Sequence, residues 1–519
     1  MNHALSANDL YLLAPELSIT LLALAVMMVD LFVKRRAVTV MVALLGLIVP
    51  AAFAITQALT LDFSVAHHAF FNMLVVDQYA IFFQILFLII AAVMILASYD
   101  YVGKYVKADG EFYTLLLFSV TGMMLMASTG ELISIYISLE LTSIPLYVMA
   151  GLIRANERSA EAAVKYVLLG AMSSAILLYG FALLYGLTGT TDLMGIAMLI
   201  KNGIHTGNVI VPLQNNIMEL VAGILILAGF GFKISAVPFH MWAPDIYEGA
   251  PTPATAFFSV GSKAAGFAAL IRVFIDGGLG QVNLLPLVIG FSIVAILTMT
   301  LGNFVAAVQA NVKRMMAYSS IAQAGYILVG VTASLASHES AGNSAVLFFI
   351  FVYVLTNLGA FSGIIALANA TGGERIEDFR GLAKRAPLLS LGTALCLLSL
   401  GGIPPMAGFI SKILIFTAAW GQGQALISSG QVVVGQSLNV LVVVALINSI
   451  ISLVYYGRLV KVMYFDAPLK DDHLSTSIGL SSSIALMTAA LIVITFAAQL
   501  VLAATSPAAN SLLAFLLGR

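Results

Sequence analysis

The chain has 519 residues, of which 61% are hydrophobic and 9% charged, and its mean hydropathy is +1.04. Soluble globular proteins carry roughly 25% charged residues, so the surplus apolar surface must face lipid. The net charge of −1 is not concentrated in a basic patch, and no nucleic-acid partner is expected. A single cysteine, Cys396, excludes an internal disulfide and is expected to pack in the core.

Apolar runs between polar breaks predict about fourteen transmembrane helices, since about 20 apolar residues span the hydrocarbon core. The expected spans are 13–33, 38–60, 75–98, 111–129, 131–151, 162–187, 218–246, 253–276, 283–305, 314–335, 341–370, 387–420, 434–457 and 480–505. Basic residues, rather than a small-residue cleavage site, follow the first span, so we expect a retained helix and not a signal peptide. The fold class is an all-α integral membrane protein.

Basic residues alternate between successive loops, as they do when every second loop is cytoplasmic. The loops after the odd-numbered spans contain Lys34, Arg35, Arg36, Lys104, Lys107, Arg154, Arg158, Lys313, Arg314, Arg375, Arg380, Lys384, Arg385, Arg458, Lys461 and Lys470. The opposite side has only Lys201 and Arg519, with Arg272 near a helix end. This asymmetry predicts that both termini lie outside the cytoplasm.

Charged residues occur inside several predicted spans, where each costs roughly 2.5–3.5 kcal/mol on insertion scales. Glu140 lies in the middle of the fifth span, Lys233 in the seventh, Lys263 in the eighth and Lys412 in the twelfth. A buried lysine without an acidic partner loses its proton more easily, which suits a proton relay. Glu140 and Lys233 could instead form a purely structural ion pair.

Other polar residues in or near the spans have weaker functional claims. Lys165 is near enough to the cytoplasmic end of the sixth span to reach the interface with its ammonium group. His240 could relay protons, or it could bond a carbonyl freed by the nearby Pro238. Three further charges lie at span ends and are expected to be ordinary interfacial charges: Glu131, Glu219 and Arg272.

Two of the lysines lie beside helix-breaking residues. Lys233 precedes Pro238, and Lys412 follows a segment containing Gly401, Gly402, Pro404, Pro405 and Gly408. Proline removes a backbone donor, and irregular backbone at membrane depth survives only in protein or beside a hydrated cavity. The seventh and twelfth spans are therefore predicted to be discontinuous, although each proline could merely kink its helix.

The two broken spans are five spans apart and run in opposite directions, which indicates two inverted five-helix repeats. We expect one membrane domain over 1–519, divided into a three-helix region (1–110), two repeats (111–280 and 281–460) and a C-terminal helix (461–519). The repeat is imperfect. The tenth span has Ser319, Ser320 and Gln323 but no acid equivalent to Glu140, and Asn448 falls near the place of a second Lys263.

Four segments resemble the antiporter-like membrane subunits of respiratory complex I, the proton-translocating NADH–quinone oxidoreductase. They are ISLELTSIPLYVMAG (137–151), GFKISAVPFHMWAPDIYEGAPTPATAFFSVGSKAAGF (231–267), NVKRMMAYSSIAQAGYILVG (311–330) and GIPPMAGFISKILIF (402–416). The segments follow the family's order across spans five to twelve. Subunits of the M type typically have Glu in place of Lys412, and those of the L type add a lateral helix, so the resemblance is greatest to the N type.

The resemblance implies that Glu140 and Lys233 are the family's acid and base, Lys263 the central relay and Lys412 the residue that delivers protons to the far side. Lys165 also falls in a family-like segment, EAAVKYVLLGAMSSA. The family implies no cofactor in this chain, with FMN, iron–sulfur clusters and quinone bound by partner subunits. It also implies a bacterial inner membrane, with an M-type subunit and the small K subunit as neighbours.

Three other functions remain open on the sequence. A subunit of a multi-subunit sodium/proton antiporter would share the helices and the lysines but would not depend on NADH. A solute transporter would need more polar side chains at its centre than this chain has. A structural scaffold would have no reason to keep lysines in mid-membrane.

Overall fold

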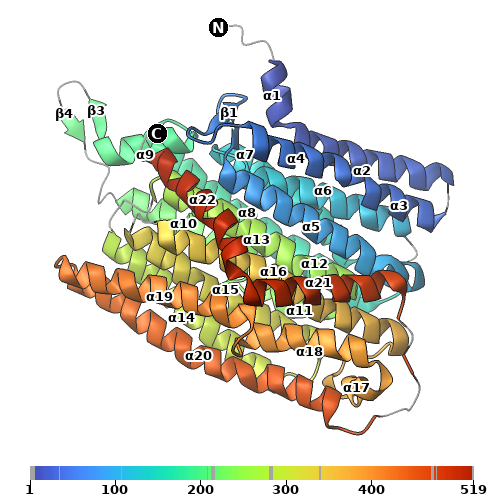
Figure 1. Ribbon diagram of the computed structural model, residues 1–519. Coiled ribbons are helices and arrows are strands. Elements are labelled where there is room, and N and C mark those ends of the chain that lie inside the picture. The colour runs from blue at the N-terminus through green and yellow to red at the C-terminus, as the bar shows by residue number, and fades with distance from the viewer. Residues whose placement is uncertain are drawn as a thin grey trace.

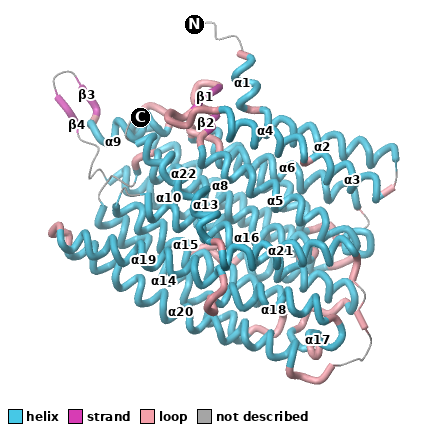
Figure 2. Tube along the Cα trace, in the orientation of Figure 1, coloured by secondary structure: helices cyan, strands magenta, loops and turns pink. Residues whose placement is uncertain are grey.

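Helices form nearly the whole molecule in the computed structural model, which describes residues 6–33, 35–106, 108–206, 209–211, 217–279, 284–337, 340–468, 473–474 and 476–516 (Figures 1 and 2). The first half contains α1 (Ala7–Leu12), α2 (Ala14–Val33), α3 (Arg36–Gly46), α4 (Ile48–Thr60), α5 (Gln78–Tyr101), α6 (Asp109–Ala127), α7 (Leu132–Ala150), α8 (Glu157–Thr188), α9 (Leu193–Asn202), α10 (Ile217–Ile234), α11 (Trp242–Gly249), α12 (Thr252–Phe257) and α13 (Lys263–Ile271). Three π-helical segments interrupt or extend these helices: η1 (Val102–Val106), η2 (Phe258–Ser262) and η3 (Arg272–Asp276).

The second half contains α14 (Leu284–Val308), α15 (Val312–Ser337), α16 (Ser340–Thr371), the 3-10 helix η5 (Ile376–Phe379), α17 (Leu382–Arg385), α18 (Pro387–Gly401), α19 (Ala407–Ser428), α20 (Val432–Tyr464), α21 (Ile478–Phe496) and α22 (Ala498–Leu516). Two antiparallel hairpins complete the described chain: β1 (His67–Ala69) with β2 (Leu74–Val76), and β3 (Ile204–Thr206) with β4 (Val209–Val211). Both hairpins lie at one end of the bundle, opposite α17 (Figure 1).

The predicted span count is confirmed once the broken twelfth span is included. Within the described residues, 13 helices are long and apolar enough to cross a membrane. The twelfth predicted span corresponds instead to α18 and α19, which are separated by the turn at 402–406. The chain is therefore a multi-pass membrane protein. The last predicted span was wrong at its end, because α21 stops at Phe496 and α22 continues in a new direction across the bundle (Figure 1).

The seventh span is also broken, as its proline predicted. The helix α10 ends at Ile234, immediately after Lys233, and α11 begins only at Trp242. Trp242 bridges the break, since its indole N–H donates to the carbonyl of Phe232 at 2.8 Å. Carbonyl groups freed at such a break must find partners inside the protein, because lipid offers none.

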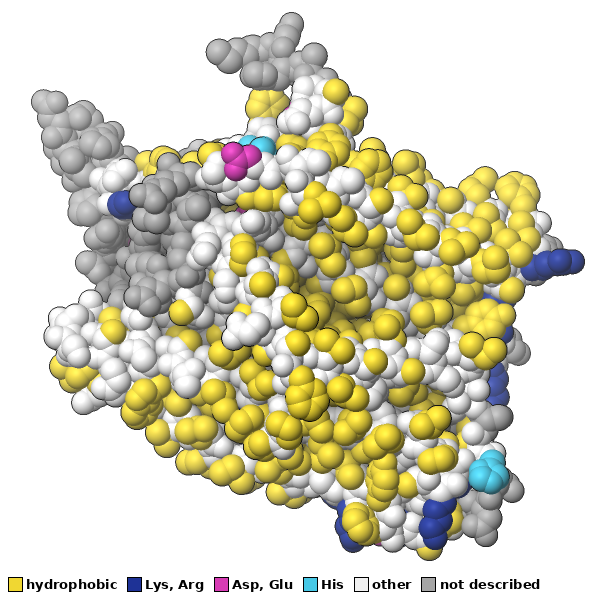
Figure 3. All heavy atoms as spheres, viewed as in Figure 1, with side chains coloured by type: hydrophobic (Ala, Val, Ile, Leu, Met, Phe, Trp, Pro, Cys, Tyr) yellow, Lys and Arg dark blue, Asp and Glu magenta, His cyan; other side chains and the backbone are white. Residues whose placement is uncertain are grey.

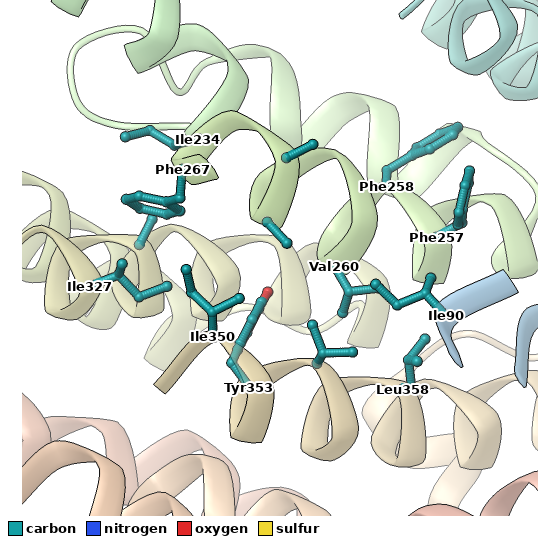
Figure 4. Packing of buried hydrophobic residues seen from close by; sticks show 14 of the residues in the cluster. Ile90, Ile234, Phe257, Phe258, Val260, Phe267, Ile327, Ile350, Tyr353 and Leu358 are labelled. Carbon is teal, nitrogen blue, oxygen red and sulfur yellow. The ribbon is translucent and has the colours of Figure 1, made fainter. Parts of the chain in front are cut away.

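Three spans lie at the centre of the bundle. The most apolar stretch is fully buried in the spans Thr252–Asp276 and Val312–Ala336 and 94% buried in Ala341–Thr371, whereas it is only 28% buried in Ala14–Val33. Figure 4 shows Val260 and Phe267 from the first of these spans packing against side chains of α15 and α16, with Tyr353 among them. Lys263 therefore lies on one of the two most enclosed spans of the described chain.

Charge is distributed unevenly over the surface. Figure 3 shows an apolar flank over most of the visible face, with Lys and Arg side chains gathered mainly toward the α17 end. Large apolar side chains are exposed on several helices, such as Leu21 on α2 and Ile450 on α20, as expected of a surface that contacts lipid.

A buried ion cluster joins α5 to the end of the eighth span. Arg272 is 1% exposed, and its guanidinium donates to Asp77 at 2.7 Å, to Asp276 at 3.0 Å and to the carbonyl of Ala127 at 2.7 Å. Asp77 also caps α5 by accepting from the Ala80 N–H. Arg272 was expected to be an interfacial charge. The expectation was wrong because the side chain turns inward, onto two aspartates whose proximity the sequence does not reveal.

Arg272→Met should destabilise the protein by about 3–5 kcal/mol, since it leaves two buried carboxyl groups without their cation. Asp77→Asn is the matched control. It retains a side-chain oxygen to cap α5, and the remaining Arg272–Asp276 pair has no net charge. The loss of stability should therefore be much smaller. Thermal unfolding midpoints of the purified protein in detergent would measure both effects, and equal midpoints for the two variants would contradict this account.

Candidate functional site

Lys233 lies at the broken end of α10 and is buried, with 3% of its surface exposed. Its ammonium donates a hydrogen bond to Oγ of Ser143 on α7. The Ser143 hydroxyl in turn donates to the carbonyl of Leu139, one turn earlier on the same helix. A serine hydroxyl both accepts and donates, so it can hold either the charged or the neutral amine.

Glu140 lies on the same helix, three residues before Ser143, and is half-buried. Its carboxylate accepts from Oγ of Ser174 on α8. No ion pair within 4.0 Å joins it to Lys233 in the described chain, so the two are not in direct contact. Each group instead bonds to a serine that the sequence analysis did not single out.

Lys263 begins α13, directly after the π-helical segment η2, and is 2% exposed. Its ammonium donates to Oγ of Ser320 on α15 at 2.5 Å. Ser320 is 2.7 Å from the hydroxyl of Tyr353 on α16, which donates to the carbonyl of Ser259 at 2.8 Å. A π-helical turn often marks a functional position in a helix, because it shifts the facing of the residues that follow.

Lys412 lies in the second turn of α19, after the break, and is 3% exposed. The ammonium donates to the carbonyl of Gly401 at 2.9 Å and to Oγ of Ser449 at 3.1 Å. It also lies 4.8 Å from the centre of the Tyr326 ring. Among the described residues, none of the three lysines Lys233, Lys263 and Lys412 has a carboxylate within 4.0 Å.

Polar groups connect the surroundings of Lys263 to those of Lys412. A small cavity there is lined in part by Tyr353, Gln323, Ser411 and Lys412. The space in which the centre of a water molecule could lie measures ≈ 10 Å³. That volume is close to the minimum for one water. Tyr353 also lies 2.7 Å from Ser320, the partner of Lys263, so the cavity adjoins the hydrogen-bonded surroundings of both lysines.

Lys233 and Lys263 are on adjacent helices but are not joined by any hydrogen bond within the described segments. Gly266, one turn after Lys263, lies against the Lys233 backbone, since a Cβ there would be 3.2 Å from Lys233 Cβ. His240 lies in the break after α10 and is 8% exposed. Among the described residues its Nδ1 has no hydrogen-bond partner, and no hydrogen bond joins His240 to Lys233 or Lys263.

Lys165 differs from the other lysines because it has acidic partners. Its ammonium lies 2.7 Å from Glu161 and 2.8 Å from Asp245, and 40% of its side chain is exposed. Asp245 also pairs with Arg314 at 2.8 Å, which places Lys165 in an ion cluster where α8, α11 and α15 meet. Asp245, which the sequence analysis overlooked, follows Pro244 in the second half of the broken span.

Two other charges predicted to be interfacial are also buried. Glu131 is 5% exposed and caps α7 by accepting from the Ser134 N–H at 2.7 Å. Glu219 is 2% exposed, and neither carboxyl oxygen has a hydrogen-bond partner within the described part of the chain. The prediction was wrong for both because a position at the end of a span does not reveal whether its helix face turns toward lipid or toward the bundle.

Comparison with known proteins gives a consistent result. Residues 129–438 match the family model described as NADH:quinone oxidoreductase/Mrp antiporter, TM. The chain is 42% identical over 476 residues to NADH-quinone oxidoreductase subunit N of Desulfitobacterium hafniense, covering 88% of this chain and 89% of the relative. It is 44% identical over 438 residues to subunit N 2 of Symbiobacterium thermophilum, with 82% and 81% covered. The chain belongs to this family of membrane subunits. Within the family it groups with the relatives named subunit N.

Solved structures of the family share the fold. A chain of respiratory complex I from Thermus thermophilus with bound aureothin is 29% identical, with a TM-score of 0.72, covering 94% of this chain and 98% of that one. A chain of the Mrp complex from Dietzia is 20% identical, with a TM-score of 0.82 and 98% of each chain covered. At that identity the second likeness concerns the fold alone.

Gly402→Ala should disturb the site around Lys412. Gly402 has a φ of +82°, and a Cβ there would be 3.0 Å from Lys412 Cδ and 3.1 Å from Nζ. We expect a stability loss of about 1–2 kcal/mol from the left-handed conformation alone. Gly401→Ala is the neighbouring control, because its Cβ would meet only side-chain atoms of Leu453 and Tyr456. Thermal unfolding that ranks Gly401→Ala as the more damaging change would contradict this expectation.

Proposed function

We propose that this chain is a proton-translocating membrane subunit of an NADH–quinone oxidoreductase, in which Glu140, Lys233, Lys263 and Lys412 carry protons. One observation supports the proposal above the others. The three lysines are each at most 3% exposed and have hydroxyl or carbonyl partners instead of carboxylates. A charged amine buried in this way is costly, so its neutral form becomes accessible and a proton can move to and from it.

The relay begins with the distance between Glu140 and Lys233. When the carboxylate approaches, its charge favours the ammonium form of Lys233. When the two separate, as their different serine partners allow, burial favours the neutral amine and the proton moves toward Lys263. From Lys263 the hydroxyls of Ser320 and Tyr353 and one water lead toward Lys412. Lys165 would serve the entry side through its ion cluster, and His240 would have at most an accessory role.

Energy for this movement would come from elsewhere in the complex. The proposal assigns no cofactor to this chain and assigns FMN, iron–sulfur clusters and quinone to partner subunits. An M-type subunit and the small K subunit are the proposed neighbours. Glu140 lies on α7 among outward-facing apolar side chains, such as Ile137 and Ile144, so a neighbour on that face would adjoin the carboxylate.

The proposal also includes the orientation and internal symmetry expected from the sequence. Both termini would lie on the non-cytoplasmic side of a bacterial inner membrane, which the gathering of Lys and Arg toward the α17 end supports. The repeats 111–280 and 281–460 are supported by the breaks between α10 and α11 and between α18 and α19, which lie in the seventh and twelfth spans.

A subunit of a multi-subunit sodium/proton antiporter is the second candidate, because the Mrp complex from Dietzia has the same fold. Gentle purification from the native membrane distinguishes the two. Flavin and iron–sulfur subunits with NADH–quinone activity would support the first function. A complex of membrane subunits alone, moving sodium against protons, would support the second.

Lys233→Ala should abolish proton translocation while leaving the complex assembled, since the amine at the broken helix is lost. The protons pumped per NADH oxidised would be measured by dye quenching in proteoliposomes that contain the whole complex. Lys201→Ala, at the exposed end of α9, is the control and should pump normally. An unchanged proton ratio in Lys233→Ala would rule out its role in the relay.

A further inference from the structure

The positive charges of Lys233 and Lys412, at the two ends of the series of buried lysines, have different kinds of neighbours. In the first half, Glu140 lies near Lys233 as an acid that can neutralise it. Around Lys412 no carboxylate is present in the described residues, yet the amine is 3% exposed. Groups other than a carboxylate must therefore stabilise the ammonium form of Lys412 when it binds a proton.

The groups that face Lys412 come from four packed helices. Lys412 meets the Tyr326 ring of α15, the Gly401 carbonyl of α18 and Ser449 of α20, and the cavity beside it is lined by Gln323 of α15 and by Tyr353 and Thr356 of α16. One bond further away, Ser452 of α20 bonds the Gly401 carbonyl and Tyr456 of α20 bonds Gln323. None of these groups carries a formal charge in its ordinary state. Among the described residues, the ring of Tyr326 is the aromatic face that meets the ammonium, with its centre 4.8 Å from Nζ.

Tyr326 is held in position by a polar cluster. Asn303 of α14 donates to the Tyr326 hydroxyl at 2.9 Å and to Asn448 of α20 at 3.3 Å. Tyr455 donates to the Asn303 amide oxygen at 3.1 Å, and Asn448 is followed directly by Ser449, which bonds Lys412. The ring therefore has its edge fixed by amides while its face receives the cation.

We propose that the Tyr326 ring stands in for the missing carboxylate and sets the proton affinity of Lys412. Tyr326 is a positioning residue in this account, because it acts through Lys412 and carries no proton itself. The inference rests on the proposed function. A ring face within about 6 Å of a desolvated ammonium stabilises the charged form, whereas it does nothing for a neutral amine. Removing the ring must therefore make Lys412 release its proton at a lower pH.

The test compares Tyr326→Leu with Tyr326→Phe in the whole complex, assembled and reconstituted into proteoliposomes. Proton translocation is measured against pH. Tyr326→Leu removes the ring, so the alkaline limb of its pH profile should move down by about 0.5–1.5 pH units. Tyr326→Phe loses the hydroxyl and its hydrogen bond from Asn303 but keeps the ring, which is fully buried and so stays packed in place. Its limb should therefore stay within about 0.3 units of the parent, because a phenyl ring binds cations nearly as well as a phenol.

Three outcomes would overturn the inference. In the first, both variants have the pH profile of the parent. In the second, both profiles shift equally, which would assign the effect to the hydroxyl. In the third, Tyr326→Leu loses pumping at every pH while Tyr326→Phe pumps normally, which would assign the ring a purely structural role. Lys412→Ala separates these results from failure of the proposed function. If that variant pumps at the parent ratio, Lys412 lies outside the relay. If it does not pump but the Tyr326 profiles agree with the parent, only the role of the ring is wrong.

Discussion

The absence of solvation for charge inside the membrane constrains the rest of this structure. Every amine placed there needs an internal partner, and the chain provides these with serine hydroxyls, backbone carbonyls and one aromatic face. The broken helices follow from the same constraint, because a carbonyl such as that of Gly401 is free to bond an amine only where the helix ends. Packing supplies the remaining stability, as the enclosed spans at the centre show.

Partners with opposite charge are used elsewhere in the molecule, which makes their absence from the lysine chain more informative. Arg272 is as deeply buried as the relay lysines but bonds two aspartates, and Lys165 has two acids within hydrogen-bonding distance. These ion pairs join elements of the fold together. If the proposed relay holds, the same protein separates charges that stabilise the fold from charges that change during a proton transfer.

Much of the fold could be predicted from the sequence because hydrophobic length and proline position act locally. The span count and both breaks, at Pro238 and near Pro404, were correct. The contacts of the site were not predictable. Ser143, Ser174 and Tyr326 are ordinary residues in helices, and only the packing of distant spans gives them an amine or a carboxylate to bond. Arg272 and Glu219 were wrongly expected to be interfacial, because the position of a residue in a predicted span gives its place along the helix but not the direction of its side chain.

The unequal surroundings of Lys233 and Lys412 have a consequence for direction. A carboxylate such as Glu140 can move away or take up a proton, so the charge it offers to Lys233 can be switched from outside the chain. An aromatic quadrupole has no second state, so the field that Tyr326 imposes on Lys412 is constant. In the proposed relay, one end is therefore adjustable and the other is fixed. Such a path would be directional, because a change applied at Glu140 would act on Lys233 and would have no equivalent at Lys412.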